Sequence, residues 1–320
     1  MIQETPGKPQ NPRIGTSRVG ESPGTQPIPG GNGQPDTTAA VERTFGMTDK
    51  DFGRLQRFIE TELGIKMPPA KKTMLESRLQ KRMRAVGIAA FSEYIDHVFE
   101  ETNRDGELIH MIDAVTTNKT DFFREPDHFR YLSEKLLPLH VGDGWGVRQP
   151  FLVWSSASST GEEPYTLAMV LDDFRATNPR FEYRILATDI STNVLERGRK
   201  AIYAEDRIIP VPDRLKKKYL LRSKDTEKRV VRVIPELRAR VFFHRLNLMA
   251  NDYNINDTFD VIFCRNVIIY FDRTNQTRLL RKLYEYLRPG GYLFLGHSET
   301  LAGMELPLFS VAPTIYRKPG

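Results

Sequence analysis

Apolar residues recur at helical spacing between residues 48 and 115. The first series, from Phe52 to Leu63, follows a T-x-x-D motif at Thr48 and Asp51 that is typical of a helix N-terminus. Further helices are expected at 70–86, 91–100 and 107–115. We therefore predict a small all-helical domain over residues 43–115.

After Thr116, short apolar runs alternate with helical stretches. Strands are predicted at 151–154, 183–187, 241–243, 260–263, 292–295 and 314–317. Helices are predicted between them at 163–175, 192–200 and 275–287, the last ended by Pro289-Gly290-Gly291. Such alternation is typical of a parallel, doubly wound α/β sheet with helices on both faces. Ligands bind these sheets at the carboxyl ends of the strands, so we expect the site there.

Two segments depart from these patterns. Residues 1–42 contain seven Pro and seven Gly but no aromatic residue, and we predict that they form a disordered tail. Residues 204–240 carry a basic helix, RLKKKYLLR, and then a Val-rich strand, RVVRVI. We expect this segment to be a small inserted subdomain with antiparallel pairing, within a domain that spans residues 116–320.

Composition limits the chemistry that is available. A chain of 320 residues that is 39% hydrophobic and 28% charged has globular rather than disordered usage. No run approaches the roughly 18 apolar residues of a membrane span, and the first residues lack a signal-peptide pattern, so we expect a cytoplasmic protein without membrane insertion. One cysteine, Cys264, and six histidines without ligand-like spacing predict no disulfide and no metal site. The net charge of +6 favours an acidic partner without identifying it.

The turn after the first predicted strand consists almost wholly of small residues. Its sequence is WSSASSTGEEPY, in which Thr160 and Glu163 are predicted to form a capping box for the next helix. Small residues let a ligand approach the backbone, and the helix N-terminus adds free N–H groups, so the turn fits a cofactor cradle as well as an ordinary capped connection. The glycine motifs of NAD and ATP sites are absent, which disfavours both ligands.

Polar groups also stand at the ends of the next three strands. Asp189 ends the second, where a carboxylate commonly binds ribose hydroxyls, although it could equally cap the following helix in competition with Ser191. Asn247 follows the third strand, and Cys264-Arg265-Asn266 follows the fourth. These positions suit a nucleoside with an amino-acid tail.

The segment that joins the two predicted domains reads TTNKTDFFREPDHF. It combines hydrogen-bonding side chains at Asn118, Thr120 and Arg124 with an aromatic pair. We interpret it as a lid over the cofactor rather than a simple linker.

Six of these motifs, in this order, resemble the chemotaxis receptor methyltransferases of the CheR family. The matching strings are TTNKTDFFRE, WSSASSTGEEPYTLAM, ILATDIS, RLNLM, FDVIFCRNVIIYFD and GGYLFLGHSE, and the resemblance covers roughly residues 45–318. It implies a helical N-terminal domain and a Rossmann-like class I methyltransferase domain that binds S-adenosylmethionine and releases S-adenosylhomocysteine. It also implies methyl transfer to glutamate side chains on the cytoplasmic helices of chemoreceptors.

Carried over position by position, the resemblance implies a set of cofactor contacts: Asn118, Thr120, Arg124, Glu163, Asp189, Asn247, Leu248, Cys264 and Arg265. Asp189 would hold the ribose, and Arg124 and Tyr270 would lie nearest the transferred methyl. Glu163 has competing roles as cap and ligand, and Glu162 is the alternative ligand. A glutamate acceptor is already ionised at neutral pH, so no general base is expected.

The predicted helix at 70–86 is strongly basic, with one acidic residue, Glu76, against Lys71, Lys72, Arg78, Lys81, Arg82 and Arg84. Such a face is usually only solvated, but the resemblance favours a docking surface for acidic receptor helices, which charge reversal at Arg78 and Arg82 would test. Subdomain 204–240 is a second candidate contact, because some family members bind a receptor's C-terminal peptide there.

Two other functions remain open at this stage. A nucleic-acid methyltransferase is disfavoured, because amino-methylating members carry N-P-P-Y or D-P-P-Y where this chain reads CRNVIIYF, and we expect no nucleic-acid partner. A non-catalytic module that senses S-adenosylmethionine is compatible with the motifs. We expect a monomer.

Overall fold

The computed structural model describes residues 46–100, 102, 106–225 and 227–320. The described residues all belong to one compact unit, Thr44–Gly320. The predicted disordered tail lies outside the described residues. Among those residues, no helix has both the length and the apolar character that a membrane span requires.

Four helices form the N-terminal part of the described chain, as predicted. They are α1 (Asp49–Leu63), α2 (Lys72–Val86), α3 (Phe91–Phe99) and α4 (Glu107–Val115), with a 3₁₀ turn, η1 (Pro69–Lys71), before α2. The predicted cap of α1 is confirmed, because the Asp51 N–H donates to Thr48 Oγ1 at 3.1 Å. Apolar side chains from all four helices pack into a core of their own, which includes Leu55, Leu79, Tyr94 and Ile112.

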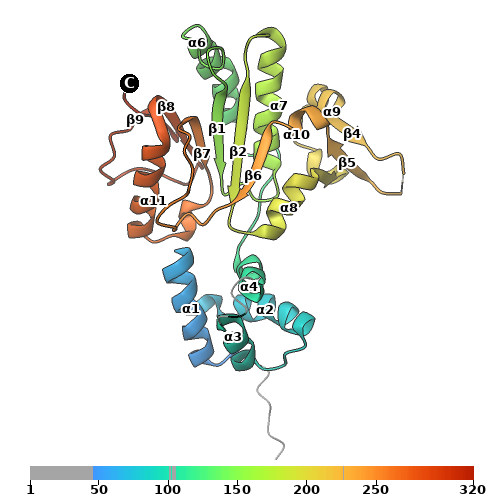
Figure 1. The fold of residues 1–320 in the computed structure, drawn as a ribbon, viewed down its shortest axis with the longest axis vertical. Coiled ribbons are helices and arrows are strands. Elements are labelled where there is room, and N and C mark those ends of the chain that lie inside the picture. The colour runs from blue at the N-terminus through green and yellow to red at the C-terminus, as the bar shows by residue number, and fades with distance from the viewer. Residues whose placement is uncertain (1–45, 101, 103–105, 226) are drawn as a thin grey trace, which may run out of the picture. The chain divides into compact units, whose positions relative to one another are not determined.

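The rest of the chain is built on a seven-stranded sheet of order β6-β2-β1-β7-β8-β10-β9 (Figure 1). The strands are β1 (Phe151–Ser156), β2 (Tyr183–Asp189), β6 (Val241–Arg245), β7 (Phe259–Cys264), β8 (Leu287–Leu295), β9 (Phe309–Ala312) and β10 (Ile315–Arg317). The first five in the spatial order run parallel, and β10 and β9 add an antiparallel edge. All six predicted strands are present, whereas β9 was not predicted.

Helices cover both faces of this sheet, which confirms the doubly wound class. Val153 of β1 packs with α7 (Glu162–Thr177) and α8 (Thr192–Lys200) in one core, and its neighbour Trp154 packs with α11 (Arg273–Tyr286) in another. Figure 1 shows α7 and α8 beside β2 and β6, and α11 beside β8. The helix before Pro289-Gly290-Gly291 ends at Tyr286, and these three residues lie within β8 rather than in a loop.

Short helices that were not predicted lead into the sheet: α5 (Pro126–Tyr131), the π-helical turn η3 (Leu132–Leu136) and α6 (Leu137–Val141). A separate three-stranded sheet, of order β3-β5-β4, occupies the inserted region and is antiparallel as predicted. Its strands are β3 (Ile202–Ala204), β4 (Leu220–Arg222) and β5 (Val230–Val233), with α9 (Asp213–Tyr219) between β3 and β4.

Candidate cofactor site

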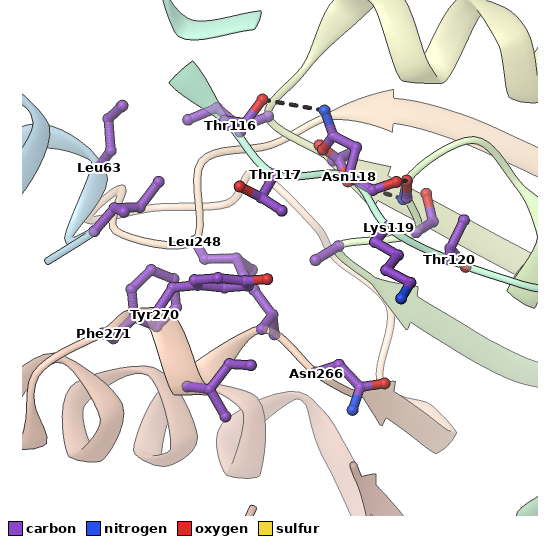
Figure 2. A pocket seen from close by; sticks show the side chains of 18 of the residues that line it. Leu63, Thr116, Thr117, Asn118, Lys119, Thr120, Leu248, Asn266, Tyr270 and Phe271 are labelled. Carbon is purple, nitrogen blue, oxygen red and sulfur yellow. Dashed lines mark hydrogen bonds between the residues drawn. The ribbon is translucent and has the colours of Figure 1, made fainter. Parts of the chain in front are cut away.

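A cavity of about 260 Å³ opens at the carboxyl ends of β1, β2, β6 and β7. The loop that follows each of these strands lines it, and the segment between the helical part and the sheet lines it from another side. Figure 2 shows Leu248 and Tyr270 on one side and Thr117, Asn118 and Lys119 on the other. Nine of the ten predicted site residues line this cavity: Asn118, Thr120, Arg124, Glu163, Asp189, Asn247, Leu248, Arg265 and Tyr270.

The tenth predicted residue, Cys264, is fully buried and does not line the cavity. Its side chain packs with Trp154 and Leu279 in the core beneath α11. The next residue in the chain, Arg265, does line it. Its role as a cofactor contact stays a prediction.

The turn after β1 is a tight cradle, but the predicted capping box is wrong. Gly161 is the N-cap of α7 with a φ of 97°, and a Cβ at this position would lie 2.8 Å from Tyr203 Oη, so glycine is required. Because Gly161 is the N-cap, the N3 position falls on Pro164, which has no acceptor, and Thr160 lies one residue too early. Thr160 Oγ1 donates instead to Glu162 at 2.5 Å.

Glu163 therefore does not cap α7, and it lines the cavity instead. Ser155 Oγ donates to Oε1 at 2.7 Å, and Arg265 Nη1 donates to Oε2 at 2.9 Å. Burial raises the pKa of Glu163 above its ordinary value of 4.5, while Arg265 and Ser155 act in the opposite direction. Glu162, the alternative ligand, is bound by Arg207 at 2.8 Å and does not line the cavity.

Asp189 lies at the end of β2 with 6% of its surface exposed. It accepts hydrogen bonds from the N–H groups of Ser159 at 2.9 Å and Ser191 at 3.0 Å, so it ties the cradle to the start of α8. Burial raises its pKa, and these backbone bonds oppose the rise. The N-cap of α8 is Ser191, which leaves the Asp189 carboxylate at the cavity wall.

The segment between the two parts of the chain is fastened to the cradle. Ser159 Oγ donates to the Asn118 carbonyl at 2.8 Å, and Arg124 Nη1 donates to the Lys119 carbonyl at 3.2 Å. Thr120 lines the cavity between them. The segment thus lines the cavity and is bonded to the cradle at Ser159, and its role as a lid stays a prediction.

Two further polar residues, Ser158 and Asn266, line the cavity but were not among the ten predicted site residues. Ser158 is 1% exposed, and within the described residues its Oγ has no hydrogen-bond partner, so it offers a buried polar group to a ligand. Asn266, with a φ of 58°, also faces the cavity (Figure 2). Ser158 is one of four serines in its motif, which gave no reason to prefer it, and Asn266 was named at the end of the fourth predicted strand without being assigned a contact.

The helical part of the chain also contributes residues to the cavity wall. No motif in the sequence indicated this contribution. Leu63, Ile65, Met67, Lys71 and Met74 line the cavity. Asn247 Nδ2 donates to the Glu62 carbonyl of α1 at 2.7 Å. The Lys66 N–H donates to the Tyr270 carbonyl at 2.8 Å, and Ile65 forms an antiparallel bridge with Phe271.

Two consecutive segments of the chain match two known protein-family models. Residues 118–316 match the SAM binding domain of CheR methyltransferase, and residues 50–116 match its all-alpha domain. The chain belongs to the CheR methyltransferase family. The chemotaxis protein methyltransferase of Borreliella burgdorferi is 39% identical over 280 residues, which are 86% of this chain and 96% of the relative. That of Escherichia coli is 36% identical over 284 residues, 89% of this chain and 96% of the relative.

S-adenosylmethionine is therefore the cofactor of this CheR methyltransferase, which acts in chemotaxis. The cavity suits this molecule, because the sulfonium and ammonium groups are positive and the buried wall carries the carboxylates of Glu163 and Asp189. The unpartnered Ser158 hydroxyl adds a polar group at the same wall.

Proposed function

We propose that this chain is a protein-glutamate O-methyltransferase that methylates glutamate side chains in the cytoplasmic domains of chemoreceptors. Methyl transfer from S-adenosylmethionine follows from the family, and the glutamate acceptor is the step that we add. The observation that supports it is the distribution of charge around the cavity. Four cationic residues line it: Arg265 is buried and paired with Glu163, whereas Lys71, Lys119 and Arg124 are at least partly exposed.

Such a cavity suits a positive donor inside and a negative acceptor at the mouth. An oxygen of the ionised acceptor carboxylate forms a bond to the methyl carbon as the carbon–sulfur bond breaks. The electron pair of that bond stays on sulfur, so the positive and negative charges cancel and no proton moves. The protein then has to align oxygen, carbon and sulfur and exclude water, and alignment can supply roughly 7–11 kcal/mol of the barrier.

Arg124 and Tyr270 are the residues we assign to the reacting centre. The Arg124 guanidinium lines the cavity and uses Nη1 for the Lys119 carbonyl, and its other N–H groups suit a carboxylate. Tyr270 also lines the cavity, across from Asn118 and Lys119 (Figure 2). The remaining eight predicted site residues are assigned to the cofactor, Cys264 through its main chain only.

The test uses methyl-labelled cofactor with receptor-containing membranes and nucleic acid in one reaction. We expect label on the receptor that alkali removes, because a carboxyl methyl ester hydrolyses under those conditions. Arg124→Ala should abolish most of the labelling. Alkali-stable label, or label on nucleic acid, would contradict the proposal, and cofactor binding without labelling would favour a sensing module.

We further propose that α2 docks on the receptor, but through different residues from those first considered. Arg82 binds Glu107 through two bonds of 2.7 and 2.6 Å, and Arg78 donates to the Val115 carbonyl at 2.7 Å. These cations hold the helical domain together and are unsuitable for charge reversal. Lys81 and Arg84 are exposed on the same helix and remain as the docking candidates.

The inserted subdomain is the second proposed receptor contact. Ile202 of β3 is 48% exposed and Leu221 of β4 is 52% exposed, which leaves apolar surface on this small sheet. The cytoplasmic location and the monomeric state stay predictions.

A further inference from the structure

Arg265 lies between two carboxylates in the wall of the cofactor cavity. Its Nη1 donates to Glu163 at 2.9 Å, and its Nη2 and Nε donate to Glu125 at 2.9 and 3.3 Å. The three side chains are 2%, 13% and 12% exposed for Arg265, Glu163 and Glu125. The guanidinium also lies over the rings of Phe129 and Phe263, at 5.4 and 5.9 Å from their centroids, so it is held on several sides.

Glu125 does not line the cavity but is bound to residues that do. Besides Arg265, it accepts a hydrogen bond from Asn266 Nδ2 at 3.1 Å. Its backbone has a φ of 57°, a conformation that costs a non-glycine residue free energy and persists only where surrounding contacts impose it. The preceding carbonyl, that of Arg124, also accepts from Arg265. Glu125 thus fastens the end of the lid segment to the end of β7.

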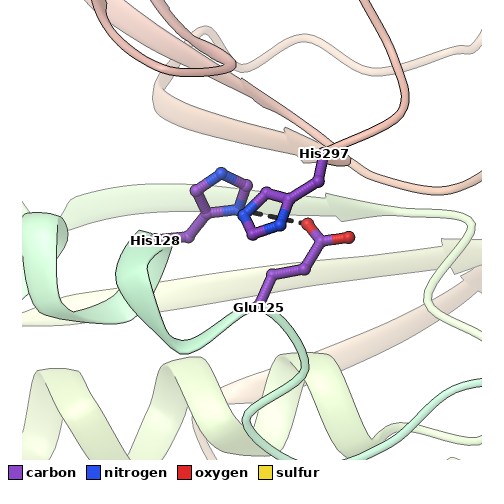
Figure 3. Close-up of side chains that lie close together, drawn as sticks. All are labelled: Glu125, His128 and His297. Carbon is purple, nitrogen blue, oxygen red and sulfur yellow. Dashed lines mark ion pairs between the residues drawn. The ribbon is translucent and has the colours of Figure 1, made fainter.

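A metal ion is the other possible use of this carboxylate. Glu125, His128 and His297 bring potential ligand atoms within 4.8 Å of one another (Figure 3). However, the Glu125 Oε2 that lies 3.6 Å from His128 Nδ1 is the same oxygen that binds Arg265 Nη2. A cation on that oxygen would face the guanidinium at close range, so the geometry favours Arg265 as the partner.

The charges of the three side chains do not cancel. Two carboxylates and one guanidinium leave one negative charge in a buried wall, where electrostatic interactions are stronger than in water. S-adenosylmethionine has a net charge of +1 from its sulfonium, ammonium and carboxylate, and S-adenosylhomocysteine, which lacks the sulfonium, has none. The negative charge of Glu125 therefore adds more to the affinity for the substrate than to the affinity for the product.

We propose that Glu125 is a positioning residue that fixes Arg265, and through it Glu163, and whose charge raises the affinity for S-adenosylmethionine relative to that for S-adenosylhomocysteine. This inference rests on the assignment of the cavity and of Glu163 to the cofactor. It adds a residue that the sequence motifs did not single out. The preference matters because the product competes for the same site after every turnover.

The test is calorimetric titration of both ligands into the full chain and its variants. Glu125→Gln should weaken S-adenosylmethionine roughly tenfold, the size expected for one lost charge-assisted hydrogen bond, and should weaken S-adenosylhomocysteine distinctly less. Asp127→Asn is the matched control, because this exposed carboxylate two residues away binds only its neighbour Arg130 among the described contacts, at 2.7 Å. It should bind both ligands as the wild type does.

A double-mutant cycle tests the route through Arg265. Glu125→Gln and Glu163→Gln should not be additive, because both carboxylates act on one guanidinium. Additive effects, or an equal loss of both ligands in Glu125→Gln, would overturn the inference. Glu125→Asp serves if the glutamine variant does not fold: it keeps the charge but shortens the reach, so affinity should fall for both ligands with the preference retained.

The proposed site and the positioning role can fail separately. If Glu163→Gln leaves the affinity for S-adenosylmethionine unchanged, the assignment of Glu163 and its cavity to the cofactor is wrong. If Glu163→Gln weakens binding but Glu125→Gln does not, only the positioning role is wrong.

Discussion

Burial and the neighbouring Arg265 have opposite effects on the pKa of Glu163. Burial raises its pKa and Arg265 lowers it, with burial the larger effect. A cationic ligand beside the carboxylate favours the ionised form, so cofactor binding and proton release from Glu163 are coupled. Glu125 behaves in the opposite way: burial would raise its pKa, but Arg265 and Asn266 lower it to about 2. Glu125 therefore stays charged while Glu163 titrates.

This contrast predicts the pH dependence of cofactor affinity. Because the pKa of Glu163 is raised, protonation begins at a higher pH than for an ordinary glutamate. Affinity for S-adenosylmethionine should therefore be constant at high pH and fall by up to roughly tenfold per pH unit below the raised pKa. Titration calorimetry between pH 8 and pH 5 measures this dependence. Asp189 also has a raised pKa, so Glu163→Gln should reduce the slope, and an unchanged slope would assign it to Asp189.

At the scale of secondary structure, α2 shows that one basic helix can serve two purposes. Arg82 on its inner side binds Glu107, which is also the acceptor of Tyr94 Oη at 2.8 Å. Burial would raise the pKa of Glu107, but the hydrogen bonds from Arg82 and Tyr94 lower it, so the carboxylate is ionised at neutral pH. Lys81 and Arg84 extend from the outer side.

Charge reversal should separate these two purposes. Arg82→Glu leaves Glu107 without its cation and places a like charge beside it, so we expect a loss of about 3 kcal/mol in the free energy of unfolding. Lys81→Glu with Arg84→Glu should leave stability within about 0.5 kcal/mol and reduce receptor methylation. Chemical denaturation and the labelling assay measure the two effects. Unchanged methylation in the folded double variant would contradict the docking role of α2.

An element can be predicted from the sequence when the residues that determine it lie close together in the chain. The cap at Thr48 is decided within four residues, and it was predicted correctly. The capping box at Thr160 failed because Gly161 takes the N-cap position, and the close approach of Tyr203 that demands glycine comes from another part of the fold. β9 was missed because its four residues are half exposed and form a strand only by pairing with β10.

In the candidate site, too, features set by nearby residues were predicted and features set by distant contacts were not. Strand ends and small residues located the cavity, because the carboxyl ends of neighbouring parallel strands must meet, and the family resemblance supplied the set of individual contacts. The sequence could not show that Arg265 joins Glu125 to Glu163, since those contacts span more than a hundred residues. Nor could it show that Ile65 and Met67 of the helical part complete the wall.

At the scale of the molecule, the cofactor cavity belongs to both parts of the chain. Asn247 binds α1 at one edge of the cavity. Asp113 of α4 accepts hydrogen bonds from the Thr192 N–H at 2.8 Å and from Thr192 Oγ1 at 2.7 Å, at the start of α8 and close to Asp189. A ligand in the cavity therefore contacts groups from both cores.

Ligand binding should consequently stabilise the two parts together. With S-adenosylhomocysteine at about 100 times its Kd, the expected gain is about 2.7 kcal/mol, which corresponds to a rise in Tm of roughly 5–10 °C. Calorimetry should show one unfolding transition that moves as a whole. Separate transitions, with only the later one shifted by the ligand, would contradict a shared cavity.

The bridge between Ile65 and Phe271, with the Lys66 bond to the Tyr270 carbonyl, has a consequence for the timing of the catalytic cycle. Separating the helices from the sheet would break these contacts next to the residue assigned to the reacting centre. Spent cofactor can leave either through the mouth while the architecture stays closed, or by an opening that dismantles the reacting centre with it. In the second case, the enzyme would be unable to methylate until the bridge had formed again. The contacts beside Tyr270 would then break and form once in every exchange of cofactor.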